Sequence, residues 1–273
     1  MKIISNRRHF LKLFAGSVAA FPLARLARAL PDGRPACRLT PEQTEGPYYL
    51  DRALLRRDIT EGKPGLPLQL HFEVLDSRTC RPLSDTALEI WHCDAQGEYS
   101  GFTAASMGGP GMGPPPGSPP LGHPPGPPPG KPGIGGAPPP SKPTDARTFL
   151  RGVQIADARG QVAFNTIFPG YYPGRCNHIH LKLHVGGHLQ DGHYRGGQLV
   201  HTGQLFFPES ASLAAMDKAP YQQHGPERTT LDQDNVYLTQ QGSGSVATLS
   251  EHDGVQIARL TLAIDPTGHS REG

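Results

Sequence analysis

The chain has 273 residues and a formal net charge of +2, from 26 Lys and Arg against 24 Asp and Glu. A near-neutral chain without a basic run lacks the charge pattern of nucleic-acid-binding proteins, so we expect no nucleic-acid partner. Charged residues make up 18% of the chain, below the roughly 25% of average soluble domains. One low-complexity segment, rich in proline and glycine, accounts for this deficit.

Residues 1–29 predict a twin-arginine signal peptide. The run Asn6-Arg7-Arg8-His9-Phe10-Leu11-Lys12 carries the arginine pair, an apolar stretch follows over residues 13–23, and Ala27-Arg28-Ala29 matches a small-x-small cleavage site. The apolar stretch is too short to span a bilayer, so we expect no stable membrane anchor. We therefore expect export to the periplasm or the extracellular space, with a basic extension of no signal function as the alternative.

Residues 30–273 are predicted to form a single β domain that contains one disordered insert. The insert, residues 105–144, is dominated by proline and glycine and cannot bury enough apolar surface to fold. Four cysteines follow the signal: Cys37, Cys80, Cys93 and Cys176. An oxidising compartment permits disulfides, and four cysteines allow three complete pairings, among which the sequence does not choose.

Alternation of apolar and polar residues predicts a series of short strands. They are expected at residues 68–75, 87–93, 152–155, 161–166, 178–184, 203–207 and 255–264. Turn residues separate them, and many short strands at this spacing indicate an all-β fold, an antiparallel β-sandwich or barrel with long loops. Little helix is expected, apart from a short segment over residues 210–216 with Ser210 as its cap.

Two histidines beside a pair of tyrosines predict a metal site. His178 and His180 flank Ile179, and because side chains alternate along a strand, both imidazoles should lie on one face. Tyr171 and Tyr172 lie shortly upstream. Ferric iron prefers anionic oxygen donors such as phenolate, and imidazoles complete such a site without adding charge.

Several sequence blocks resemble those of the intradiol ring-cleavage dioxygenases, the family of protocatechuate 3,4-dioxygenase and catechol 1,2-dioxygenase. The blocks are Thr40–Tyr49, Ile90–Ser100, Phe149–Gly152, Phe164–Ile167, Pro169–His180 and Gln204–Phe207. Together they cover residues 40–207, apart from the proline-rich insert. The resemblance implies a non-haem Fe(III) enzyme that uses O2 to cleave a catechol-type ring between its two hydroxyl-bearing carbons, giving a muconate-type diacid.

The resemblance also implies roles for individual residues. The iron ligands would be Tyr99, Tyr172, His178 and His180, with Tyr172 as the ligand that substrate releases. Arg175 would stabilise negative charge that builds on the ring, and Gln204 would orient either Arg175 or the substrate. Tyr171 is the neighbour that competes with Tyr172 for the ligand role, and Tyr48 is expected either to line the substrate pocket or to pack in the core.

Two other readings compete with the dioxygenase. A zinc or copper site on the histidine pair would need a third histidine or a carboxylate, and would leave the tyrosines unexplained. A secreted, transthyretin-like binding module without catalytic iron would fit the strand pattern but has no use for all four ligand side chains. The expected partners are a catechol-type small molecule and O2. The sequence does not tell which catechol is the substrate. A homo-oligomer is possible, but we expect no dimer of the kind that catechol 1,2-dioxygenases form through a long N-terminal helical segment.

Overall fold

The computed structural model describes residues 37–52, 54–106, 141–225 and 227–272. The predicted signal peptide and most of the predicted insert lie outside these residues. Within them, strands dominate and helices are short, which confirms the predicted all-β fold. No helix among the described residues is long and apolar enough to cross a membrane.

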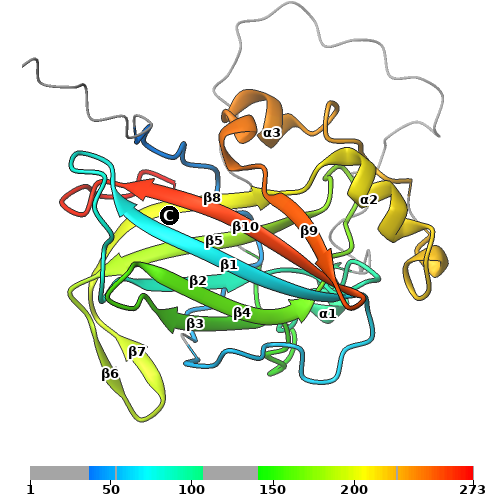
Figure 1. Cartoon of the computed structure of the whole chain (residues 1–273). Helices are drawn as coiled ribbons and strands as arrows, with labels where there is room; N and C mark the ends of the chain where they lie inside the picture. Colours follow the sequence, from blue (N-terminus) through cyan, green and yellow to red (C-terminus); the bar gives the residue numbers. More distant parts are fainter. Residues whose placement is uncertain (1–36, 53, 107–140, 226, 273) are drawn as a thin grey trace, which may run out of the picture. The chain divides into compact units, whose positions relative to one another are not determined.

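Among the described residues, two four-stranded sheets and one small hairpin make up the β structure (Figure 1). The first sheet has the order β4 (Gln161–Ile167), β1 (Pro67–Asp76), β10 (Val255–Ile264) and β9 (Thr248–His252). The second has the order β3 (Arg151–Ile155), β2 (Ala87–Trp91), β5 (His178–Val185) and β8 (Gln198–Phe206). The hairpin pairs β6 (His188–Gln190) with β7 (His193–Arg195).

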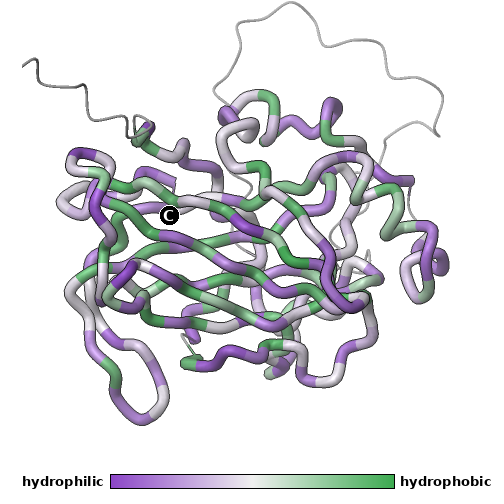
Figure 2. Tube along the Cα trace, in the orientation of Figure 1, coloured by the Kyte–Doolittle hydropathy of each residue, from purple (hydrophilic) through white to green (hydrophobic). Residues whose placement is uncertain are grey.

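Nearly all strand pairs are antiparallel, as the sequence predicts. The exception is the pair β1 and β10, which runs parallel along its whole length. Alternating apolar side chains from both sheets form one core between them, including Leu70 and Phe72 from β1 and Ile179 and Leu181 from β5. Figure 2 shows the corresponding alternation of apolar and polar residues along the strands.

Strands β2 and β5 are buried on both faces, unlike β1. One face of each meets the core, and the opposite face carries polar side chains, among them Glu89, His178, His180 and Lys182. Strands of a one-sided sandwich expose that second face to water. Here it is covered, so the polar residues on it are held in a second, internal layer.

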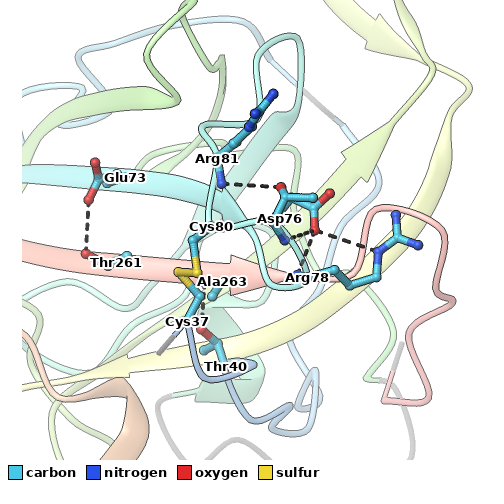
Figure 3. Close-up of a disulfide and its surroundings, with 10 residues drawn as sticks. Cys37, Thr40, Glu73, Asp76, Arg78, Cys80, Arg81, Thr261 and Ala263 are labelled. Carbon is cyan, nitrogen blue, oxygen red and sulfur yellow. Dashed lines mark hydrogen bonds and ion pairs between the residues drawn. A yellow bond between two sulfur atoms is a disulfide. The ribbon is translucent and has the colours of Figure 1, made fainter. Parts of the chain in front are cut away.

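The N-terminal part of the described chain, residues 37–50, is attached at its start to the first sheet and to the turn after β1. The Thr40 N–H donates to the carbonyl of Ala263 (2.8 Å), and the Ala263 N–H donates to the Thr40 hydroxyl (2.9 Å). A disulfide joins Cys37 to Cys80, just past the end of β1 (Figure 3). Cys93 and Cys176 are free and buried, so one of the two disulfides of a complete pairing is present and the second, Cys93–Cys176, is not formed.

Three shorter elements differ from the sequence prediction. Helix α2 (Glu209–Met216) begins after Pro208 without a side-chain cap, so the expectation of Ser210 as the cap was wrong and this residue lies within the first turn. Strand β9 and the β6–β7 hairpin were not predicted. Two other helices lie in loops: α1 (Thr103–Ser106) and α3 (Asn235–Thr239).

The described end of the predicted insert is attached to the domain. The Ser141 N–H donates to the carbonyl of Pro47 (2.9 Å), and the Thr144 N–H donates to the carbonyl of Gly101 (2.7 Å). These bonds join the end of the insert to the N-terminal segment and to the loop after β2. Both of those segments contribute to the site described next.

Candidate metal centre

His178 and His180 lie on the same face of β5, as strand alternation requires. Both side chains are fully buried, and their Nε2 atoms are 3.1 Å apart. The Nδ1–H of His178 donates to the carbonyl of Cys176 (2.7 Å), which leaves the lone pair on Nε2. The two rings therefore present nitrogens to one point.

Tyr99 reaches the histidines from the loop after β2. Asp94 shapes this loop, because its Oδ1 accepts the N–H groups of Gln96 and Glu98 (both 2.9 Å). Gly97 has a φ of +80°, and a side chain there would come within 2.2 Å of the Tyr171 carbonyl oxygen. The close approach of the two loops thus requires glycine, and it brings Tyr99 within 5.8 Å of Tyr172, measured between ring centroids.

Tyr171 and Tyr172 lie on opposite sides of their loop. Tyr172 packs edge-on against His178, with 5.6 Å between ring centroids, and belongs to the buried aromatic cluster that contains Tyr99. Tyr171 instead packs on His224, with centroids 4.3 Å apart. Of the two neighbouring tyrosines, the structure brings only Tyr172 to the histidine pair.

Aromatic rings enclose the four side chains. The indole of Trp91 stacks on the imidazole of His180, with ring centroids 4.9 Å apart and planes 7° from parallel. Tyr48, from the N-terminal segment, stacks on Tyr99 (4.6 Å) and meets Tyr172 edge-on (5.6 Å). The Tyr48 hydroxyl is buried and has no hydrogen-bond partner among the described residues. The result is a buried aromatic cluster in which electrostatic interactions are strong.

Arg175 extends its guanidinium into the same group of residues. Its Nη1 lies 3.3 Å from the Tyr172 hydroxyl and 3.4 Å from the Nε2 of His178. Its Nη2 donates to Oε1 of Gln204 at 2.5 Å. Gln204 reaches this position because it pairs with His180 across β5 and β8. The four predicted iron ligands therefore meet Arg175 and Gln204 at one place.

Burial determines which forms these groups take. It lowers the pKa of both His178 and His180, and the Arg175 cation lowers them further, so both imidazoles are neutral near pH 7. Burial also raises the pKa of Tyr172, which the nearby guanidinium opposes. The pKa of Tyr99 is raised well above its usual value for the same primary reason. Two neutral phenols that resist ionisation in this pocket become good anionic ligands only beside a cation.

The arrangement fits a metal ion with mixed nitrogen and oxygen ligands. Two nitrogens that each lie about 2.1 Å from one metal, at roughly a right angle, are about 3 Å apart, close to the 3.1 Å between the two Nε2 atoms. Among the described residues, no group of three or more His, Cys, Asp or Glu side chains could hold a metal. The donors that do accompany the histidine pair are the phenols of Tyr99 and Tyr172.

Three buried residues that the sequence did not single out support this site. Arg151 donates to the Ser100 hydroxyl and to the carbonyls of Ser100 and Tyr48, which joins the Tyr99 loop to the N-terminal segment. Gln43 accepts the Gln204 N–H (2.9 Å). Asp234 accepts from Arg175 Nε (2.8 Å). No motif announces Asp234; its only local signal is an aspartate placed before a short helix.

Solved structures of dioxygenases resemble this chain closely. One is an intradiol ring-cleavage dioxygenase from Tetranychus urticae, with 31% identity, a TM-score of 0.67, and a match over 86% of this chain and 98% of that one. A second dioxygenase matches with 30% identity, a TM-score of 0.68 and the same coverage. The dioxygenase domain of a carbohydrate-binding fusion protein from Streptomyces sp. SirexAA-E has 22% identity and a TM-score of 0.50, and shares the fold.

No family model matches the chain, and no curated protein does. The structural matches carry the assignment, because an identity of 31% holds over 98% of a solved relative. With 86% of its residues aligned at that level, this chain belongs to the intradiol ring-cleavage dioxygenase family.

Proposed function

We propose that this protein is a non-haem ferric dioxygenase that cleaves a catechol-type ring between its two hydroxyl-bearing carbons. The observation that carries the proposal is the meeting of two neutral imidazoles, 3.1 Å apart at Nε2, with two buried phenols and one guanidinium. Neither a binding module nor a zinc site has a use for both phenols. The expected product is a muconate-type diacid.

Tyr99, Tyr172, His178 and His180 would hold the iron. Two phenolates balance two of the three positive charges of Fe(III), and the two imidazoles add none, so the site keeps one net positive charge. A catechol would chelate ferric iron bound here through its two oxygens, and the iron would make the ring reactive toward O2. The net positive charge of the site favours a dianionic, chelating substrate.

The chain's own residues supply protons, charge and exclusion of water. Tyr172 would be the exchangeable ligand, and its phenolate oxygen, when free of the metal, would accept a proton from a catechol hydroxyl. Arg175 lies 3.3 Å from that oxygen and would stabilise negative charge that develops there and on the ring. The aromatic cluster around Tyr48 and Trp91 keeps water away, so each of these interactions is strengthened.

Colour and iron content test the proposed cofactor. Protein produced with iron should carry about one ferric ion per chain and a red-brown band from tyrosinate-to-iron charge transfer. Tyr172→Phe should alter this band, whereas Tyr171→Phe, the matched neighbour that packs on His224, should leave it unchanged. A colourless protein without stoichiometric iron contradicts the proposal.

Oxygen uptake tests the reaction. A panel of catechol, hydroxyquinol, protocatechuate and larger lignin-derived catechols should contain at least one compound that consumes one O2 per ring. Mass spectrometry should find the product heavier than the substrate by both oxygen atoms. A product opened outside the diol, or uptake equal to that of an Arg175→Ala variant, argues against this chemistry.

We also propose export through the twin-arginine pathway, from the sequence of residues 1–29. The Cys37–Cys80 disulfide supports an oxidising destination, since such bonds are rare in the cytosol. Fractionation of cells that express the wild type and an Arg7→Lys, Arg8→Lys variant tests this. Retention of both proteins in the cytoplasm would count against export.

A further inference from the structure

A buried carboxylate lies behind Arg175, on the side away from Tyr172. The side chain of Asp234 is completely buried, and its Oδ2 accepts from Arg175 Nε and from the Cys176 N–H, both at 2.8 Å. Its other oxygen, Oδ1, accepts the Tyr237 N–H at 3.0 Å and caps helix α3. Asp234 thus caps a helix with one carboxylate oxygen and binds the guanidinium with the other.

Gln204 binds a second nitrogen of the guanidinium. Its Oε1 accepts from Arg175 Nη2 at 2.5 Å, while its Nε2 donates to the Thr44 carbonyl (2.8 Å). Its backbone N–H donates to Oε1 of Gln43 (2.9 Å). With Nε on Asp234 and Nη2 on Gln204, Nη1 is the nitrogen that faces the Tyr172 hydroxyl.

Asp234 and Gln204, which both bind the guanidinium, are linked to each other through helix α3. Asp234 lies at its start and Gln240 at its end. Gln240 accepts the Thr44 N–H with its Oε1 (2.7 Å), and its carbonyl accepts from Gln43 Nε2 (3.1 Å). A closed ring of contacts therefore runs from Asp234 through Arg175 and Gln204 to the N-terminal segment and back to α3.

The charge of this pair matters because both partners are buried. Breaking a buried ion pair by removing one charge leaves the other uncompensated. Coulombic attraction is strong in a buried site, and a planar guanidinium that donates from two of its nitrogens keeps one orientation. A guanidinium held by Gln204 alone would be free to turn about its Nε–Cδ axis, and Nη1 would leave the Tyr172 oxygen.

We propose that Asp234 is a positioning residue for ring cleavage, which orients Arg175 so that its Nη1 faces the phenol oxygen of Tyr172. This inference rests on the proposed function, because the value of that orientation lies in stabilising charge on the substrate ring. Asp234 itself touches neither the phenols nor the imidazoles in the contacts described above. Its effect is transmitted through Arg175.

Asp234→Asn separates this role from helix capping. Asparagine caps helices as well as aspartate does, so Oδ1 can still accept the Tyr237 N–H. The amide NH2 then faces the two donors that Oδ2 served, Arg175 Nε–H and the Cys176 N–H. Asp234→Ala removes the cap as well, and serves as the variant that reports on structural loss.

The first readout needs no iron. In the metal-free, full-length chain, the Arg175 Nε–H should give a slowly exchanging, downfield proton resonance, identified by its loss in Arg175→Lys. Asp234→Asn should abolish or shift it. Glu209→Gln is the matched control: it breaks the Arg228–Glu209 pair, both contacts at 2.7 Å, on the same segment. It should lower stability and leave the Arg175 resonance in place.

The second readout is steady-state turnover of the iron-loaded enzyme. Losing a charge-assisted hydrogen bond to the guanidinium should lower kcat about 10- to 100-fold, with little change in KM because the substrate is still chelated. Asp234→Asn should unfold below the wild-type temperature, because the buried guanidinium loses its counter-charge, so kcat is measured well below that transition. The charge-transfer band should shift, since Arg175 no longer contacts the Tyr172 oxygen.

Two outcomes overturn the inference. If Asp234→Asn keeps the Arg175 resonance and the wild-type kcat while Asp234→Ala is unstable, Asp234 is a helix cap and nothing more. If the resonance is lost but kcat does not fall, the orientation of Arg175 has no value for turnover. If the wild-type chain binds no iron and cleaves no catechol, the proposed function itself is wrong. That result depends on the wild type alone, so it is distinguishable from the two outcomes above.

Discussion

Gly46 lies against the imidazole of His180, and replacing it with alanine tests that contact directly. Gly46 has a φ of +74°, and a Cβ built there lies 2.9 Å from Cε1 of His180. Carbon atoms pack at roughly 3.5–4 Å, so the methyl group and the ring cannot both stay in place. The ring has little room to move, because it is fully buried and stacked on Trp91.

The magnitude has two parts. An L-residue in the left-handed region costs about 1–2 kcal/mol, and overpacking a buried site costs about 1–3 kcal/mol more. Gly46→Ala should therefore lower the free energy of unfolding by about 2–5 kcal/mol. Gly62 is a matched control, with a φ of +75° and nothing within 4 Å of its added Cβ. Gly62→Ala should lose only the stability that the left-handed backbone costs an L-residue, about 1–2 kcal/mol.

Urea denaturation of the two variants measures the difference. The excess loss in Gly46→Ala, about 1–3 kcal/mol, belongs to the contact with His180. Iron content after reconstitution gives a second measure: it should fall in Gly46→Ala and stay at the wild-type level in Gly62→Ala. Equal losses of stability in the two variants, with equal iron, would refute the placement of Gly46 against this histidine.

Three further changes probe other parts of the fold. Burial raises the pKa of Glu89 from 4.5 to about 7, so the folded chain holds this proton more tightly and the stabilisation is lost as pH rises through that range. Urea titrations should show the stability of the wild type relative to Glu89→Gln falling by up to about 1.4 kcal/mol per pH unit between those values, and a constant difference contradicts this. Replacing Cys37 and Cys80 by serine opens a loop with a sequence separation of 43 and should cost about 4 kcal/mol by loop entropy; an unchanged melting temperature under oxidising conditions would show that the bond adds nothing. Thr166→Val removes the hydrogen-bond partner of His92 Nε2, 2.7 Å away. It should lower the free energy of unfolding by about 1–3 kcal/mol and leave iron content unchanged. A loss of iron would mean that His92 has a role beyond structure.

Exposure explains which strands the sequence predicted. Strands β1, β4, β5 and β10 have a buried face, and their alternation or apolar content is visible in the chain. Strand β9 is almost wholly exposed, as is β6, so neither carries an apolar pattern. The first half of β8 was missed for another reason: a register shift opposite Leu183 and His184 breaks its alternation.

The choice between Tyr171 and Tyr172 shows the limit of local pattern. Adjacent residues in a loop follow no fixed period, so their sequence does not say which ring turns inward. Tertiary contacts determine which ring turns inward. Gly97, in the loop after β2, packs against the Tyr171 carbonyl, and the Tyr171 ring packs on His224. Asp234 lay beyond prediction for a similar reason, since it is 59 residues from Arg175 and belongs to no motif.

The sequence by itself determined the donor types and the face on which the two histidines lie. Stereochemistry of the extended chain places residues i and i+2 on one side, wherever the strand ends up. Tertiary structure alone decided what meets that face: Gln204 through the register of β8, Tyr99 and Tyr172 through the joined loops, and Asp234 through a helix from a distant segment. Such contacts depend on how separate segments pack, and no local period encodes them.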